Sequence, residues 1–494
     1  MILLVLQEQS GSRASGPILS DGEDALERLT GFREVFYSEV LTGRRDALFE
    51  ACEALLETPG RVEVFPYLSL SPRFGRGHDM LYQALNSGKV DCRRFRRAAL
   101  RQRMPMVGGR IVLAVDVTPW LRPDANTSSE RAFCHVHGRG RGADSRIPGW
   151  PYSMVAAVGS GTSSWTALLD IERVGAGGND SVTAALQLRR TVTGLIGAGH
   201  WRIGDADIMA VTDSLYAEAY LAHQLADLPV IVVSRVRSDR VFYAPAPDRV
   251  ASGAGRPARH GAKMSLKDPA TWPDTAQAVE QQHDAYGRLS VRSFDDLHQK
   301  VSRQTVVWAG HDGPLPVIAG TLIRLEPERL SHAGNPEQVW LWASAVRLDA
   351  DLLTACFTAW LRRFDIEHTF RFLKQYLALT LPRLRSPEAA DRWVVLVGAA
   401  YIQLAMARSL VADRPFAWER PLEPDRLTPV RVKRGFRHLQ AALPILSGMP
   451  KTRQGGTGRP RGSKNHGKAP VRHPGKYPHL NHMRTARAQQ APSP

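Results

Sequence analysis

A helical stretch in the last third of the chain carries an aligned row of charged residues. Residues 360–379 read WLRRFDIEHTFRFLKQYLAL. On a single helix at about 100° per residue, four side chains fall within about 60° of one another: Trp360, Arg363, Glu367 and Lys374. The other sides are mostly apolar, as in a buried helix. One acid and two cations on such a stripe could bind a charged substrate, whereas an exposed Arg–Glu pair of this spacing is a common surface feature.

Two aspartates stand in apolar strands. Asp116 lies in the run IVLAVDV (111–117), and Asp213 ends the run DIMAVTD (207–213). Either one alone fits an ordinary strand-end residue, because an acid there is tolerated when a cation balances it. Together with Glu367 they supply oxygen ligands from separate elements, which suits Mg²⁺. Two such ions about 3.5–4 Å apart would activate a nucleophile and stabilise the leaving oxygen of a phosphodiester.

The spacing of these residues resembles the signature of a known family. The row Trp360-x2-Arg363-x3-Glu367-x6-Lys374 is similar to the Tyr-x2-Arg-x3-Glu-x6-Lys signature of the DDE transposases of bacterial insertion sequences, with Trp in place of Tyr. The blocks VLAVDVTPW and IMAVTDSLY resemble the two aspartate blocks of that family. The long β-rich stretch before the glutamate also matches. The resemblance covers about residues 105–445.

The resemblance implies a fold and a reaction. It implies an RNase H-like core in which catalytic Asp116, Asp213 and Glu367 bind two Mg²⁺ ions, for which Mn²⁺ can substitute. Water and then a DNA 3′-hydroxyl would attack phosphodiesters, first cutting the ends of the element and then joining them to target DNA. The partners are therefore double-stranded DNA, as terminal inverted repeats and as target, and a second copy of the chain in a homodimer on that DNA.

The same helix supplies candidate DNA contacts. Arg363 and Lys374 would contact the element-end DNA near the scissile phosphate, and Arg371 would add a third cation. Trp360 departs from the family pattern because it lacks the tyrosine hydroxyl. It would stack on a base or sugar of the DNA, or it would fill the core.

The charge of the whole chain also favours a polyanionic partner. The 494 residues carry a net charge of +17, and the pI is about 10.1. Nucleic acid is the first expectation, an anionic membrane the second, and a basic protein without such a partner the alternative. The arginine-rich segment 92–103, CRRFRRAALRQR, would contact phosphates or form a solvated helix end. The segment 456–465, GTGRPRGSKN, resembles an AT-hook or binds phosphates non-specifically. The DNA-binding candidates in these two segments are Arg93, Arg94, Arg96, Arg97, Arg459 and Arg461.

The elements that must position these residues alternate between strand and helix patterns. We expect an α/β fold, an RNase H-like mixed sheet flanked by helices. In this reading a helix capped by Asn179 or Asp180 lies between the aspartate strands. The expected divisions are a flexible N-terminus (1–21), a helical and DNA-binding region (22–105), the first part of the core (106–236), a β-rich insertion (237–350), the second part of the core with the Glu-bearing helix (351–445) and a basic disordered tail (446–494).

Several function classes are excluded by what the sequence lacks. The four cysteines form no Cys-x-x-Cys pair, so neither a zinc knuckle nor a disulfide framework is expected. MILLVLQEQS is too short for a signal peptide, and the apolar run at 393–407 is too short to span a membrane. No phosphate-binding G-x-x-x-x-G-K-[ST] motif occurs, so no nucleotide cofactor is expected. These features favour a cytoplasmic, nucleoid-associated protein.

Two other functions remain open. An RNase H-like nuclease without strand transfer would use the same acids and metals. An inactive, domesticated transposase would act only as a DNA-binding protein, although the presence of all three acids and of the Arg and Lys row argues against it.

Overall fold

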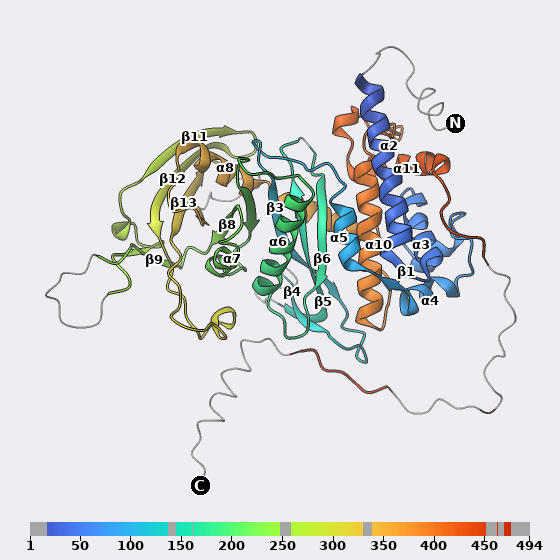
Figure 1. The fold of residues 1–494 in the computed structure, drawn as a ribbon, viewed down its shortest axis with the longest axis horizontal. Helices are drawn as coiled ribbons and strands as arrows, with labels where there is room; N and C mark the ends of the chain where they lie inside the picture. The colour runs from blue at the N-terminus through green and yellow to red at the C-terminus, as the bar shows by residue number, and fades with distance from the viewer. Residues whose placement is uncertain are drawn as a thin grey trace, which may run out of the picture.

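The computed structural model describes residues 17–136, 145–161, 163–247, 258–329, 338–450, 462 and 469–475. A large mixed sheet runs through the molecule, flanked by helices, and a group of helices covers one end (Figure 1). The architecture is mixed α/β and consistent with the RNase H-like fold expected from the sequence. Arg459 and Arg461 lie outside the described residues.

The middle of the sheet contains the strands that carry the two aspartates. β3 is parallel to β7, β7 is parallel to β8, and the long β5 pairs antiparallel with β3 on its other side. β5 also pairs with β4 through its first half and with β6 through its second half. The bounds are β3 (Val112–Leu121), β4 (Ala132–Val136), β5 (Ser145–Val158), β6 (Thr166–Arg173), β7 (Ile208–Thr212) and β8 (Val230–Val236).

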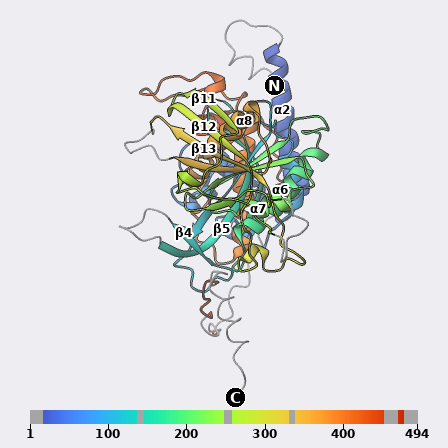
Figure 2. The same ribbon diagram turned by 90° about the vertical axis from the view of Figure 1, so that its left-hand side faces the viewer.

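The strands between β8 and the last helices extend this same sheet. β14 pairs antiparallel with β8, with Trp340 opposite Val236, and β13, β12 and β11 follow outward. In Figure 2 this side faces the viewer, with β11, β12 and β13 above β4 and β5. A separate two-stranded sheet pairs β9 with β10. The bounds are β9 (Val241–Tyr243), β10 (Lys263–Ser265), β11 (Gln277–His283), β12 (Gly287–Leu297), β13 (Gly320–Pro327) and β14 (Val339–Ala343).

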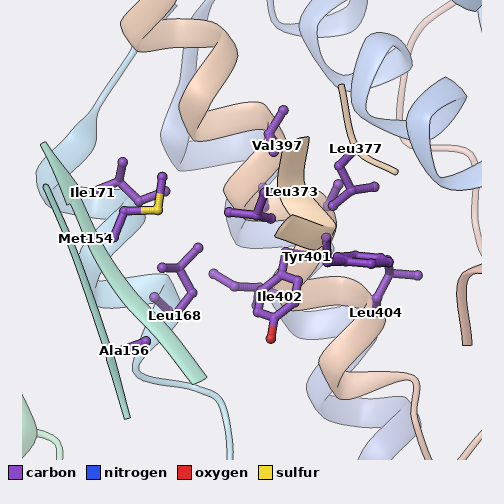
Figure 3. Close-up of a cluster of buried hydrophobic side chains, with 14 of the residues drawn as sticks. Met154, Ala156, Leu168, Ile171, Leu373, Leu377, Val397, Tyr401, Ile402 and Leu404 are labelled. Atoms are coloured by element: carbon purple, nitrogen blue, oxygen red, sulfur yellow. The ribbon is translucent and has the colours of Figure 1, made fainter. Parts of the chain in front are cut away.

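Helices cover the two faces of the sheet because side chains alternate along each strand. Leu113 and Val115 of β3 pack in one core with α6 (Asp180–Gly197) and α7 (Glu218–Gln224). Val112 and Ala114 face the other core, under α8 (Ala350–Leu361), α9 (Phe364–Gln375) and α10 (Pro387–Met406). Figure 3 shows that second core, where Met154 and Leu168 of the sheet face Leu373 of α9 and Val397 of α10.

The N-terminal helices pack around α10 on the side away from the sheet. A buried arginine joins them, since Arg33 donates to Glu53 (Nη1–Oε1, 2.5 Å) and to Gln403 of α10 (Nη1–Oε1, 2.9 Å). The helices here are α2 (Pro17–Val35), a π-helix (Phe36–Val40), α3 (Arg45–Glu57), a 3₁₀ helix (Phe65–Leu70), α4 (Asp79–Ser87), α5 (Cys92–Ala99) and α11 (Pro429–Ala442). A short sheet pairs β1 (Leu41–Gly43) with β2 (Lys89–Val90), and further 3₁₀ turns span Pro269–Thr271, Val306–Trp308 and Pro424–Arg426.

The stretch 360–379 is not the single helix that its pattern indicates. α8 ends at Leu361 and α9 begins at Phe364, and the backbone between them makes a tight turn in which Arg363 N donates to Trp360 O (3.0 Å). The two helices pack on different strands: α8 contacts β7, β8, β11 and β13, whereas α9 contacts β3, β5 and β6. The chain therefore turns at Arg362 and Arg363, where it changes from one set of strands to the other.

Within the described part of the chain, we find no helix with the length and apolar content needed to cross a membrane.

Candidate active site

The register of two parallel strands brings the aspartates together. In the β3–β7 pair, Ala114 lies opposite Val211, and each aspartate follows two residues later. Alternation then places Asp116 and Asp213 on the same face as Ala114 and Val211, which is the face under α9. Each carboxylate also accepts a hydrogen bond from the next backbone N–H, at 2.8 Å for Asp116 and 2.7 Å for Asp213. Asp116 thus lies within β3 and Asp213 directly after β7, with both side chains on the same face.

α9 brings an arginine and a glutamate to the same place. Arg363 is only 3% exposed, and its Nη1 lies 3.5 Å from Oδ2 of Asp116. Its Nη2 lies 3.3 Å from Oε1 of Glu367, whose side chain is 50% exposed. One buried guanidinium thus balances the charge of two acids that the sequence predicted as catalytic. The half-exposed Glu367 keeps one side open to solvent.

The electrostatics of Asp116 favour the approach of further positive charge. Burial raises the pKa of Asp116 to about 6; Arg363 and a backbone hydrogen bond oppose that shift, and the nearby Glu367 and Asp213 add to it. A carboxylate whose charged form is disfavoured by burial and by neighbouring acids gains most from a cation. Arg363 supplies part of that charge in the structure.

A cleft of about 1040 Å³ joins these groups. Both aspartates and Glu367 line it, together with Arg371 and Lys374 of α9. Burial lowers the pKa of Lys374, and Cys134 and Asp116 oppose that shift, which places this ammonium group in the field of Asp116. Of the predicted row, Glu367 and Lys374 therefore line one cleft, whereas Arg363 does not line it and contacts the acids from the buried side.

Trp360 lies in the core and not in this cleft. It is 4% exposed, and its Nε1 donates to the backbone oxygen of Thr212 at 3.3 Å. This contact ties the end of α8 to the end of β7, one residue before Asp213. The core-filling alternative fits this position, because almost none of the indole surface is accessible to DNA.

Two further residues of the cleft carry polar groups that sequence reasoning did not assign to the site. Asp180 is the first residue of α6, and burial raises its pKa. The side chain of Tyr216 is 4% exposed, and its hydroxyl has no hydrogen-bond partner in the described part of the protein. Burial, Asp116 and Asp180 raise the pKa of Tyr216 well above its usual range, so the hydroxyl is a donor. Their positions in the sequence could have indicated both residues, because Tyr216 follows Asp213 by three residues and Asp180 is next to the helix cap Asn179.

The arginine-rich helix lies apart from the cleft. α5 is capped by Asp91, whose side chain accepts from Arg94 N, and the helix packs against β6 and α10. Arg96 is partly used in the fold, since its Nη1 lies 3.4 Å from Oδ1 of the buried Asp170. Arg93, Arg94 and Arg97 are exposed, and Arg94 also contacts Asp91. None of the four arginines lines the cleft.

The acids offer a donor set that fits a divalent cation. Carboxylate oxygens are the ligands of Mg²⁺ and Mn²⁺, and the raised pKa of Asp116 marks a position that added positive charge would stabilise. Among the described residues, no three His, Cys, Asp or Glu side chains lie close enough to enclose an ion. Instead, Arg363 contacts both Asp116 and Glu367, and the side chain of Glu367 is half exposed.

The comparison with protein families agrees with this geometry. The family model of the DDE superfamily endonucleases matches residues 36–298, more than half of the chain. The match includes Asp116 and Asp213 and ends before Glu367, so the position of Glu367 rests on the structure. A comparison with curated proteins returned no match. Endonucleases of this superfamily generally use divalent metals and act on DNA. By its sequence match, the chain belongs to the DDE superfamily endonucleases.

Proposed function

We propose that the protein is a DNA transposase that cleaves phosphodiesters at the ends of a bacterial insertion sequence and joins those ends to target DNA. The observation that carries the proposal is that Asp116, Asp213 and Glu367 line one cleft and that the buried Arg363 contacts two of them, Asp116 and Glu367. Membership of the DDE superfamily endonucleases supports a metal-dependent nuclease reaction at this site.

The three carboxylates would hold two Mg²⁺ ions, for which Mn²⁺ can substitute. When bound, such ions activate the attacking oxygen and stabilise the leaving oxygen of the phosphodiester. The chain's own residues then do the rest. The metal ligands would be the carboxylate oxygens of Asp116, Asp213 and Glu367. The buried Arg363 holds Asp116 and Glu367 in place through its guanidinium.

The cations of the cleft would balance the phosphate charge. Lys374 lies in the field of Asp116, and Arg371 is exposed on the same wall. Both can contact the strand that enters the cleft. The buried Arg363 cannot reach far into solvent, so its role is to position the acids as well as to lower the local negative charge.

The rest of the chain would bind the DNA outside the cleft. We assign the helical region 22–105 to this role, with the exposed Arg93, Arg94 and Arg97 as phosphate contacts and Arg96 as a weaker one because it pairs with Asp170. Arg459 and Arg461 would add contacts from the basic tail. The net charge of +17 supports a large phosphate interface, and we propose a homodimer on DNA in the nucleoid.

The proposal is tested with purified protein and a duplex that carries the terminal inverted repeats of the element. We expect nicking at the repeat ends only with Mg²⁺ or Mn²⁺, and joined products when a target duplex is added. Cleavage without joining would favour the second candidate, a nuclease, which the family match supports equally. DNA binding without cleavage would show an inactive, DNA-binding descendant.

A further inference from the structure

A short segment of the C-terminal tail is bound to the edge of the sheet beside the cleft. Residues 469–475 run along the stretch that leads into β4. Arg472 N donates to Asn126 O at 2.7 Å, and Gly475 N donates to Arg131 O at 2.7 Å. Gly475 also forms a parallel bridge with Ala132, the first residue of β4. The segment is therefore held by backbone contacts in the manner of an added strand.

A buried arginine strengthens this attachment. Arg131 is almost fully buried, and its Nη2 donates to the carbonyl oxygen of Arg472 at 2.7 Å. The same guanidinium donates to the carbonyl oxygens of Arg122 and Ser128, which lie in the stretch under the tail. One side chain thus fastens the tail to that stretch.

The end of the segment forms part of the cleft wall. Gly475 lines the same cleft as Asp116, Asp213 and Glu367. It packs so closely on the loop before α6 that an added Cβ would lie 2.6 Å from Ala176 O and 2.8 Å from Ala176 Cβ. Only glycine fits this contact without moving the segment, so the placement of the tail depends on Gly475.

The docking leaves the charge of the segment exposed. Both backbone groups of Arg472 are bonded, and its side chain and that of His473 are exposed. Arg371 and Lys374 of α9 line the same cleft that Gly475 lines. A phosphate backbone that runs from the cleft along the segment would meet positive charge from α9 and then from Arg472.

We propose that residues 469–475 form one wall of the DNA-binding cleft and that Arg472 contacts the DNA backbone next to the scissile phosphate. This inference rests on the proposed function, because it takes DNA as the occupant of the cleft. It also assigns a place and a role to part of a tail that composition alone marks only as basic.

Two substitutions separate the charge from the docking. Arg472→Ala removes the guanidinium and keeps the backbone hydrogen bonds, whereas Gly475→Val keeps every charge and displaces the segment from Ala176. Binding of the element-end duplex is measured by fluorescence anisotropy over a range of salt concentrations. We expect both variants of the full chain to bind several-fold more weakly and to lose about one unit of the salt slope. Arg472→Lys should retain the slope, and Arg414→Ala, an exposed arginine of the α10–α11 loop, should change the affinity less.

A cleavage reagent tethered to the tail locates the contact. Val471 is exposed, and Cys92 is the one exposed cysteine among the four, so Val471→Cys in a Cys92→Ser background gives a single attachment point. An iron chelate on this cysteine should cut the DNA within a few bases of the scissile phosphate. Cutting elsewhere, or none in a bound complex, would overturn the placement.

The outcomes distinguish this inference from the proposed function. If the wild-type protein binds and cleaves the repeats but both variants keep the wild-type salt slope, the inference fails and the proposed function stands. If only Arg472→Ala weakens binding, the contact does not need the docked segment, and the wall assignment is overturned. If the wild-type protein does not bind the repeats at all, both fail.

Discussion

The guanidinium of Arg363 lies 3.5 Å from the carboxylate of Asp116, so the residue directly before α9 is fixed to β3, an interior strand of the sheet. The same guanidinium reaches Glu367 one turn along α9. This arrangement explains how a stretch that is apolar on most sides keeps an acid and an arginine: Arg363 pairs with Glu367 and with Asp116 of β3. It also couples the position of α9 to the charge state of the acids.

Replacing Arg363 should reveal that coupling. In Arg363→Ala, Asp116 and Glu367 lose their shared cation, and we expect the free energy of unfolding to fall by about 2 kcal/mol. This loss is smaller than for a fully buried ion pair, because Glu367 is half exposed. Mg²⁺ should restore part of the loss, because its charge replaces that of the guanidinium. Chemical denaturation with and without Mg²⁺ measures both effects. Arg371→Ala, on the same helix but exposed, is the control, and an unaltered stability of Arg363→Ala would contradict the assignment.

The raised pKa of Asp116 predicts a specific pH dependence of the metal-free protein. Its folded-state pKa of about 6 exceeds the usual value, so the folded state binds more protons than the unfolded state. The stability that Asp116 contributes is therefore fully present below about pH 4 and is lost as the pH rises through about 6. Relative to that of Asp116→Asn, the free energy of unfolding of the wild type should fall by about 2 to 3 kcal/mol over this pH range. Unfolding curves of both proteins between pH 4 and 7 test this, and a constant difference would show that Asp116 titrates normally.

The hydroxyl of Tyr216 should matter for the reaction more than for folding. Because this buried hydroxyl has no partner among the described residues, Tyr216→Phe should leave the thermal midpoint unchanged or raise the stability by up to about 1 kcal/mol. We expect the cleavage rate to fall several-fold, since a donor beside the acids is removed. A clear loss of stability in Tyr216→Phe would mean that the hydroxyl is already satisfied in the free protein.

Trp360 should behave as a core residue. Trp360→Ala should lower the free energy of unfolding by about 3–5 kcal/mol, and Trp360→Phe by less. DNA affinity of the folded Trp360→Phe variant should equal that of the wild type when measured by anisotropy. Weaker DNA binding at unchanged stability would instead support the stacking role that the family signature suggested.

The sequence predicts more of the chemistry than of the packing. The apolar runs that contain Asp116 and Asp213 indicate buried strands, and the mixed α/β architecture follows from the order of patterns. The pairing of Ala114 with Val211 is a property of the folded sheet, and it decides that the two aspartates meet. No local pattern could supply that register, because it depends on contacts far apart in the chain.

The remaining differences have the same physical origin. The break between α8 and α9 accompanies a change of strand partners, from β7 and β8 to β3 and β5, which a helical wheel does not contain. The junction of Trp340 with Val236, which merges the insertion with the main sheet, depends on an edge that only the fold exposes. The docking of residues 469–475 depends on Arg131 and Gly475, and the composition of the tail gave no sign of it.

We propose that Asp116, Asp213 and Glu367 act together on a DNA phosphodiester. The direct measurement is Mg²⁺-dependent cleavage of the element-end duplex by Asp116→Asn, Asp213→Asn and Glu367→Gln, each checked for folding by its thermal midpoint. Asp365→Asn is the matched control, because this acid lies on the same helix and pairs with Arg362 (Oδ2–Nη2, 2.5 Å) outside the cleft. We predict a loss of at least about a hundredfold for each of the three and a much smaller change for Asp365→Asn. Wild-type cleavage by any of the three folded variants would contradict the claim.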